Sequence, residues 1–214
     1  MSTYLYFKKY NYMNKIITFL KKYRLTILIA LLILAAVAAI EFHNGRSPLG
    51  PDGHFGWWDG NVWGSENSQR VADAYSFSHI IHGMLFYAFL WLVVRLLPPR
   101  LREKFPLRYR LIAAMLIEAG WELLENSPLI INRYREATIA QGYVGDSILN
   151  SVCDIIMMML GFLIARFSKV WACIVLIIVL EVGCLFWIRD NLTLNVLMLV
   201  HPSEQIKVWQ SEGH

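Results

Sequence analysis

The chain has 214 residues, of which 57% are hydrophobic and only 17% are charged, and its mean hydropathy is +0.44. This composition excludes an ordinary soluble domain and predicts a protein that crosses a membrane several times. The net charge of +4 does not indicate nucleic acid binding, because the basic residues lie beside apolar runs, where they set the orientation of membrane proteins. The sequence has no zinc-finger spacing and no RNA-binding motif, so no nucleic acid partner is expected.

The first 75 residues divide into a basic, an apolar and a polar segment. Residues 1–24 contain six lysines and arginines and no acid, which is typical of a segment that lies on an anionic membrane surface. Residues 25–40 are uninterrupted apolar sequence and predict the first membrane span. Residues 41–75 are polar and rich in glycine and tryptophan, which predicts a loop at the membrane surface.

Four further apolar segments follow and predict spans at residues 74–94, about 107–126, about 145–165 and 170–188. Residues 126–145 predict a second polar loop, and residues 191–214 predict a polar tail. The predicted fold is therefore all-α: a polytopic membrane bundle of five transmembrane helices over residues 25–190, preceded by an interfacial helix over residues 1–24.

The distribution of lysine and arginine predicts the orientation of these spans. The N-terminal segment, the connection 95–110 and the turn 166–169 are basic, which places them in the cytoplasm. The loops 41–75 and 126–145 then lie outside. All five spans alternate in direction without conflict, so the N-terminus is expected in the cytoplasm and the C-terminus outside.

Three of the predicted spans carry polar side chains that apolar segments ordinarily lack. At about 100° per residue, the members of each group share one helix face. The groups are His79 and His82; Glu118, Glu122 and Glu125; and Asp146, Asn150 and Asp154. The directions of the spans bring all three groups to the outer half of the membrane, where Glu41 and Glu181 could join them. A charged side chain in a membrane costs roughly 2.5–3.5 kcal/mol, so this layer is expected to have partners.

Three hypotheses explain the layer. In the first, it binds one divalent metal ion (Zn, Mn or Mg), with His79, His82, Glu122 and Asp154 as candidate ligands. In the second, it performs acid–base catalysis without a metal, because adjacent buried carboxylates differ in pKa. In the third, the residues only hydrogen-bond the helices together. The spacing alone does not choose among them, since neither H-E-x-x-H nor E-x-x-H occurs.

An enzyme would use these residues in distinct roles. The candidates are Glu118 or Glu122 as base, His79 or His82 as proton carrier or ligand, Asn150 as hydrogen-bond donor to developing charge, and Asp154 as ligand or orienting group. Substrate contacts are expected from Arg133 and Arg135, which suit an anionic head group, and from Asp146 and His54. For the loop residues the alternative is ordinary solvated charge.

Several segments resemble a known family. "GWWDG", "SHIIHG", "EAGWELLENSPLIINRYREAT" and "GDSILNSVCD" are similar to a family of alphaproteobacterial multi-pass inner-membrane proteins that has only a domain-of-unknown-function label. The likeness covers about residues 30–190 and implies an inner-membrane setting, with the C-terminus in the periplasm. A fainter likeness is to VanZ-type membrane proteins, whose pattern is matched by Glu118 or Glu122, Arg133, Asp146, Asn150 and Gly161. The pair of histidines departs from that pattern.

The function expected from these observations is that of a membrane-embedded enzyme. A polar layer in the outer leaflet suits hydrolysis of, or group transfer to or from, a lipid or a lipid-linked substrate. The first alternative is a transporter coupled to protons or ions, because acids within membrane spans mark such pathways. The second is a non-catalytic membrane assembly protein that uses the polar layer for helix contacts.

Overall fold

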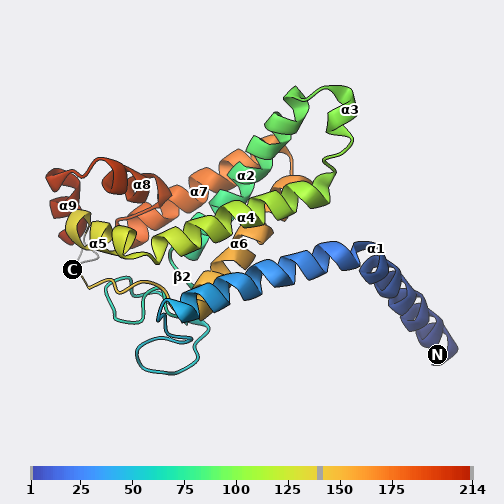
Figure 1. The fold of residues 1–214 in the computed structure, drawn as a ribbon, viewed down its shortest axis with the longest axis horizontal. Helices are drawn as coiled ribbons and strands as arrows, with labels where there is room; N and C mark the ends of the chain where they lie inside the picture. The colour runs from blue at the N-terminus through green and yellow to red at the C-terminus, as the bar shows by residue number, and fades with distance from the viewer. Residues whose placement is uncertain (1, 139–141, 213–214) are drawn as a thin grey trace.

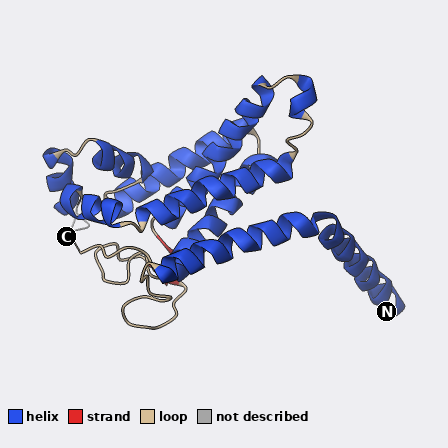
Figure 2. Cartoon of the chain, in the orientation of Figure 1, coloured by secondary structure: helices blue, strands red, loops and turns tan. Residues whose placement is uncertain are grey.

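The computed structural model describes residues 2–138 and 142–212, and it consists of helices joined by loops (Figure 2). The strands in these described residues are β1 (Trp58–Asp59) and β2 (Ala72–Asp73), which pair in parallel within the long loop that follows the first helix. The predicted all-α fold class is therefore confirmed.

Five helices have 19 residues or more in the described part of the chain: α1 (Ser2–His43), α2 (Ser76–Leu96), α4 (Leu107–Glu125), α6 (Ile148–Phe167) and α7 (Val170–Ile188). Four segments there are both long and apolar enough to cross a membrane, namely Leu20–His43 within α1 and all of α2, α6 and α7. These four segments indicate a membrane protein. Helix α4 is as long as α7 but carries five charged residues.

Helix α1 is continuous, whereas the sequence predicts an interfacial segment and a separate span. Residues 2–43 contain neither glycine nor proline, so no residue interrupts the helix between its basic and its apolar part. Figure 1 shows that the first part of α1 bends away from the other helices, while the second part lies beside α4 and α6.

Two segments that were predicted to be irregular form helices. The predicted polar loop 126–145 contains α5 (Pro128–Ala137), and the predicted tail contains α8 (Leu192–Val200) and α9 (Glu204–Ser211). Pro128 is the first residue of α5, a position where the fixed backbone angle of proline favours a helix. Ile131, Tyr134 and Ala137 of α5 are buried, so the helix is stabilised by one buried face. A further short helix, α3 (Pro99–Arg102), follows α2.

Helices α2 and α6 approach each other unusually closely. A Cβ atom on Gly83 would lie 1.9 Å from the Met158 carbonyl oxygen, and one on Gly161 would lie 1.9 Å from the Ile80 carbonyl oxygen. Glycine is therefore required at both positions, because only a residue without a side chain lets the two backbones meet. Met158 at this crossing belongs to the same apolar core cluster as Met115 of α4.

The helices place the predicted polar layer at one end of the bundle. Figure 1 shows α5, α8, α9 and the long loop 44–75 gathered at one end of the long helices, with α3 at the other. The first turns of α2 and α6 and the last turns of α4 lie at the end that carries α5 and the long loop.

Candidate functional site

A cavity of about 420 Å³ lies at the end of the bundle that carries the long loop. Its walls come from the first turns of α2 and α6, the second half of α4, helices α5 and α8, and loop residues around positions 67 and 146. The three helices of the predicted polar layer thus surround one space.

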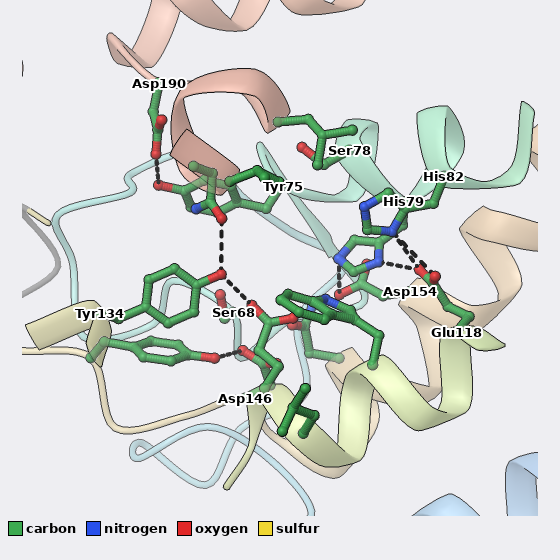
Figure 3. A pocket seen from close by; sticks show the side chains of 18 of the residues that line it. Ser68, Tyr75, Ser78, His79, His82, Glu118, Tyr134, Asp146, Asp154 and Asp190 are labelled. Carbon is green, nitrogen blue, oxygen red and sulfur yellow. Dashed lines mark hydrogen bonds and ion pairs between the residues drawn. The ribbon is translucent and has the colours of Figure 1, made fainter. Parts of the chain in front are cut away.

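His79, His82 and Glu118 form what we call the histidine end of the cavity (Figure 3). Nδ1 of His79 lies 2.6 Å from Oε1 of Glu118, and Nδ1 of His82 lies 3.1 Å and 3.2 Å from the two oxygens of the same carboxylate. The three-residue spacing puts both imidazoles on one face of α2, and α4 brings Glu118 against that face. Glu118 is fully buried, whereas the His82 side chain is 16% exposed.

Two more carboxylates lie behind the imidazole of His79. Oδ2 of Asp154 is 3.7 Å from Nε2 of His79, and Oε1 of Glu122 is 3.4 Å from Nδ1. The Ser76 hydroxyl donates a hydrogen bond to Oδ1 of Asp154 at 3.1 Å. Neither oxygen of Glu122 has a hydrogen-bond donor among the described residues, although the side chain is fully buried. A buried carboxylate without a donor is costly, so Glu122 requires a local compensation.

Asp146, Asp190, Tyr75 and Tyr143 form what we call the aspartate end of the cavity. Figure 3 shows Asp146, Asp190 and Tyr75 on the side away from the histidines. The Tyr75 hydroxyl donates to Oδ2 of Asp190 at 3.1 Å, and the Tyr143 hydroxyl donates to Oδ1 of Asp146 at 2.7 Å. Each aspartate thus has a tyrosine donor and lies in a loop next to a helix end. Burial raises the pKa of both aspartates to about 6, although the tyrosine hydrogen bonds act in the opposite direction.

Tyr134 of α5 also contributes to the cavity wall. Its hydroxyl lies 2.9 Å from Oε1 of Glu125 and 3.0 Å from Oδ1 of Asn195. These contacts connect α4, α5 and α8, so the helix that replaces the predicted polar loop closes one side of the cavity.

One wall of the cavity is apolar and reaches the outer surface of α4. Ile117 and Leu124 line the cavity and are 42% and 44% exposed. Gly120 lies between them, and a Cβ atom added there would meet nothing within 4 Å. The cavity therefore combines a polar interior with an apolar edge on the helix surface.

Asn126 organises a second polar cluster directly after α4. Its Nδ2 atom lies within hydrogen-bond distance of Glu41 at 3.3 Å, Asp146 at 3.2 Å and Ser151 at 3.0 Å, while its Oδ1 accepts from the Asp146 backbone N–H at 2.7 Å. Glu41 therefore joins the polar layer through Asn126, as its predicted depth allows. Glu181 does not, because its carboxylate accepts backbone hydrogen bonds from Leu192 and Thr193 at the start of α8.

Three of the predicted substrate-binding residues do not line the cavity. His54 is an exposed loop residue beside Asp52. Arg133 donates to the Leu199 carbonyl at 2.8 Å, and Arg135 donates to the Tyr143 carbonyl at 2.5 Å. These two arginines hold the helices and loops around the cavity together, and the remaining candidate, Asp146, does line it.

Of the three residues predicted on one helix face, Asn150 and Asp154 lie in α6, whereas Asp146 does not. Asp146 precedes α6, which begins at Ile148, so it reaches the cavity from a loop and not along the face of a helix. Asn150 lies in the first turn of α6 and donates from Nδ2 to the Arg70 carbonyl at 2.9 Å. That bond ties the long loop to α6 and uses one of the two amide hydrogens. Its predicted contact with developing charge stays a prediction.

The geometry favours a different set of metal ligands from the predicted one. His79, His82 and Glu118 offer nitrogen and oxygen atoms that all lie within 4.8 Å of one another, as do His79, Glu122 and Glu125. The sequence favours Glu122 and Asp154 as ligands instead of Glu118. Helical spacing cannot distinguish Glu118 from Glu122, because both lie on the same face of α4 and only the packing of α2 decides which meets both histidines.

Comparison with known proteins identifies relatives over most of the chain. The model of a family described as a protein of unknown function (DUF2585) matches residues 41–212. The chain belongs to the DUF2585 family. A UPF0314 protein of Sphingopyxis alaskensis is 50% identical over 186 residues, which cover 87% of this chain and 95% of the relative. A UPF0314 protein of Rhizobium etli is 50% identical over 180 residues, covering 84% and 88%. One of Novosphingobium aromaticivorans is 51% identical over 178 residues, covering 83% and 88%.

No solved structure matches the fold. The family predicted from the sequence is therefore confirmed, and the DUF2585 match includes every residue of both cavity ends. The fainter likeness to VanZ-type proteins stays a prediction.

The sequence interpretation missed the tyrosines of the cavity and Asp190. Tyr75, Tyr134 and Tyr143 lie in segments that were predicted to be loops, and Asp190 follows the last predicted span. The available signal was that tyrosine and aspartate stand next to the ends of apolar segments, where this DUF2585 chain leaves one helix and enters the next. That signal is weak, because tyrosine is common at such positions in membrane proteins.

Proposed function

We propose that this protein is a membrane-embedded enzyme that hydrolyses, or transfers a group to or from, a lipid or a lipid-linked molecule. It spans the bacterial inner membrane five times. Helix α4, which carries five charged residues, is counted as a span beside the four apolar segments. The buried position of Glu118 and Glu122 supports this count, since the outward side of α4 presents apolar residues such as Leu116 and Ile117. The lysine and arginine distribution supports an orientation with the N-terminus in the cytoplasm and the cavity near the periplasmic face.

The observation that carries the proposal is the combination of a carboxylate–imidazole cluster with an apolar wall in one cavity. The histidine end can activate a water molecule or an acceptor hydroxyl, and the wall around Gly120 can receive an acyl or prenyl chain from the membrane. A substrate with a polar head and an apolar tail fits both the histidine end and the apolar wall. A soluble metabolite has no apolar tail for that wall.

The reaction class follows from these groups. Water, or a hydroxyl of an acceptor, attacks an ester carbon or a phosphorus atom of the head group while a carboxylate of the cluster takes its proton. The bond to the leaving oxygen breaks, and the same proton neutralises that oxygen. Glu118 and the two histidines hold the attacking group in place, and Asp146 and Tyr75 at the other end contact the head group.

The test uses purified protein in vesicles made from the total lipid extract of an alphaproteobacterium. Mass spectrometry of the lipids over time is expected to show that at least one lipid class is consumed by the wild-type protein. Glu118→Gln is expected to lower this rate by at least about 100-fold, in the range typical for loss of a group in acid–base catalysis. Glu136→Gln, the same change at an exposed position of α5, is the matched control and keeps the rate.

Gly120→Leu tests the membrane-facing wall separately from the chemistry. The Cβ atom of the added side chain meets nothing within 4 Å, so the folded protein is expected to keep its thermal stability. Consumption of long-chain lipids is expected to fall, and that of a short-chain analogue to persist. A lipid composition that changes equally with wild-type protein and Glu118→Gln would overturn the proposed function.

A further inference from the structure

The histidine end gathers three carboxyl groups around one imidazole. Glu118, Glu122 and Asp154 all lie within 4 Å of an imidazole nitrogen of His79. Among the described residues that line the cavity there is no lysine and no arginine. The two histidines are the basic groups in contact with these three carboxylates, so a cation would stabilise the site.

We propose that His79, His82 and Glu118 bind one divalent transition-metal ion, with zinc as the best fit. Two imidazole nitrogens and one carboxylate oxygen converge within 4.8 Å, and two histidines with one glutamate are a known ligand set of catalytic zinc. Such sites leave one position open for water or substrate, and here the cavity adjoins the three ligands. Imidazole ligands favour zinc over magnesium, which prefers oxygen.

The surroundings of His79 match those of a metal-bound histidine. When Nδ1 of His79 binds the ion, the other ring nitrogen carries a hydrogen that points toward Asp154 at 3.7 Å. A carboxylate at this position fixes the orientation and the tautomer of a ligating imidazole. The Ser76 hydroxyl, which donates to Asp154 at 3.1 Å, holds that carboxylate in turn.

Glu122 provides an independent observation. Both of its oxygens are buried without a donor among the described residues, and one lies 3.4 Å from the His79 nitrogen that would bind the metal. A cation beside this carboxylate removes the cost of burying it, and a metal-bound water would donate a hydrogen bond to it. Glu122 would then be the group that accepts the proton of the attacking water, because Glu118 is occupied as a ligand.

The inference deepens the proposed function and rests on it for its chemical meaning. Bound zinc would supply a Lewis acid and make a bound water more acidic, which suits hydrolysis or transfer at a lipid head group. Binding itself can be measured without turnover, so the two proposals can fail separately.

The experiment uses the full chain purified with a tag that contains no histidine, stripped with EDTA in detergent. Zinc titration by calorimetry is expected to show one ion per chain, and cobalt substitution is expected to give the visible absorption of a tetrahedral site. His79→Ala, His82→Ala and Glu118→Gln should each abolish this binding. Asp154→Asn, which leaves all three ligands in place, is expected to weaken it by about 10–100-fold.

Control variants distinguish this site from unspecific binding. His43→Ala and His201→Ala remove exposed histidines and are expected to leave zinc affinity and stoichiometry unchanged. Thermal unfolding of each stripped variant checks that it is folded; if His79→Ala is not, the isosteric Glu118→Gln variant decides. Zinc binding that persists in folded Glu118→Gln, or absence of binding in the wild type, would overturn the inference.

The outcomes also separate the two proposals. Zinc bound at this site without any lipid conversion would contradict the proposed function and leave the metal site standing. Lipid conversion by a wild-type protein that binds no zinc in the titration would contradict the metal site and leave the proposed function standing.

Discussion

The two ends of the cavity are built in different ways. At the histidine end, His79, His82 and Glu118 all lie within regular helices, and their distances follow from how α2, α4 and α6 pack. At the aspartate end, Asp146 and Asp190 lie in loops next to helix ends, and tyrosine hydroxyls hold them in place. One end depends on helix packing, and the other depends on hydrogen bonds from several different segments.

This difference separates the roles of the two ends. A helix-borne cluster is held rigidly by the packing of backbones, which suits groups that must meet a reacting atom or a metal within a few tenths of an ångström. Loop-borne carboxylates with tyrosine partners can adjust to a head group and can change protonation. The comparison predicts that the histidine end is sensitive to packing changes and the aspartate end to pH.

The largest loss of stability is expected from substitutions at the crossing of α2 and α6, which supports the histidine end. Gly83→Ala would place a methyl group 1.9 Å from the Met158 carbonyl oxygen, which forces α2 and α6 apart. Because overpacking alone costs about 1–3 kcal/mol, and more where the backbone must move, we expect loss of most folded protein in detergent, measured by thermal unfolding. Gly161→Ala is expected to act in the same way from the other helix.

Gly120→Ala is the matched control for this prediction. The same methyl group there meets nothing within 4 Å, and alanine stabilises a helix relative to glycine by about 1 kcal/mol. The unfolding temperature should therefore stay equal or rise. Equal stability of Gly83→Ala and wild type would show that the histidine end does not depend on the close approach of α2 and α6.

The second effect is a pH dependence from the aspartate end. Burial raises the pKa of Asp190 from its ordinary value of 3.8 to about 6, so between these values the folded protein binds more protons than the unfolded chain. The contribution of Asp190 to the free energy of unfolding is therefore greatest below about pH 4 and falls as pH rises through 6. The full difference corresponds to roughly 3 kcal/mol, about half of which falls between pH 5 and pH 7.5, so we expect a higher unfolding temperature at pH 5 than at pH 7.5.

Asp190→Asn tests the assignment with little change in shape. Its amide oxygen can replace one of the two carboxylate oxygens, so it keeps either the hydrogen bond from Tyr75 to Oδ2 or the one from the Asn191 backbone to Oδ1, and the amide does not ionise. The unfolding temperature of this variant should depend less on pH than that of the wild type. Asp52→Asn, at an exposed loop position, should leave the slope of unfolding temperature against pH unchanged between pH 5 and 7.5. An unaltered slope in Asp190→Asn would show that this carboxylate does not titrate in this range.

The smallest effect is expected where the aspartate end joins α4. Asn126→Leu removes the amide that contacts Glu41, Asp146 and Ser151. Leaving buried groups without a partner costs about 1–3 kcal/mol, so the unfolding temperature should fall moderately while zinc affinity at the histidine end is retained. Asn126→Asp, which keeps the shape, should also lower stability because it replaces a donor by a third carboxylate. Loss of zinc binding in a folded Asn126 variant would show that the two ends are not independent.

Much of the histidine end could be predicted from the residues alone. The spacing of His79 and His82, and of Glu118 and Glu122, fixes which side chains share a helix face, because an α-helix repeats about every 3.6 residues. The alternation of basic and apolar segments fixes at which end of the bundle these faces meet. At the aspartate end only Asp146 was predicted; Asp190 and the tyrosines could not be, since they follow no period and their neighbours come from distant loops.

The sequence by itself determined the family, the helical fold class, four apolar segments and the gathering of acids and imidazoles at one level. These features depend on composition and helical periodicity, which are local. Only the tertiary structure decided that Glu118 and not Glu122 bridges the two histidines, that α5 and α8 replace predicted irregular segments, and that His54 lies outside the cavity. Those outcomes depend on how closely α2 and α6 approach and on which loop covers which helix end, and such contacts join residues that lie far apart in the chain.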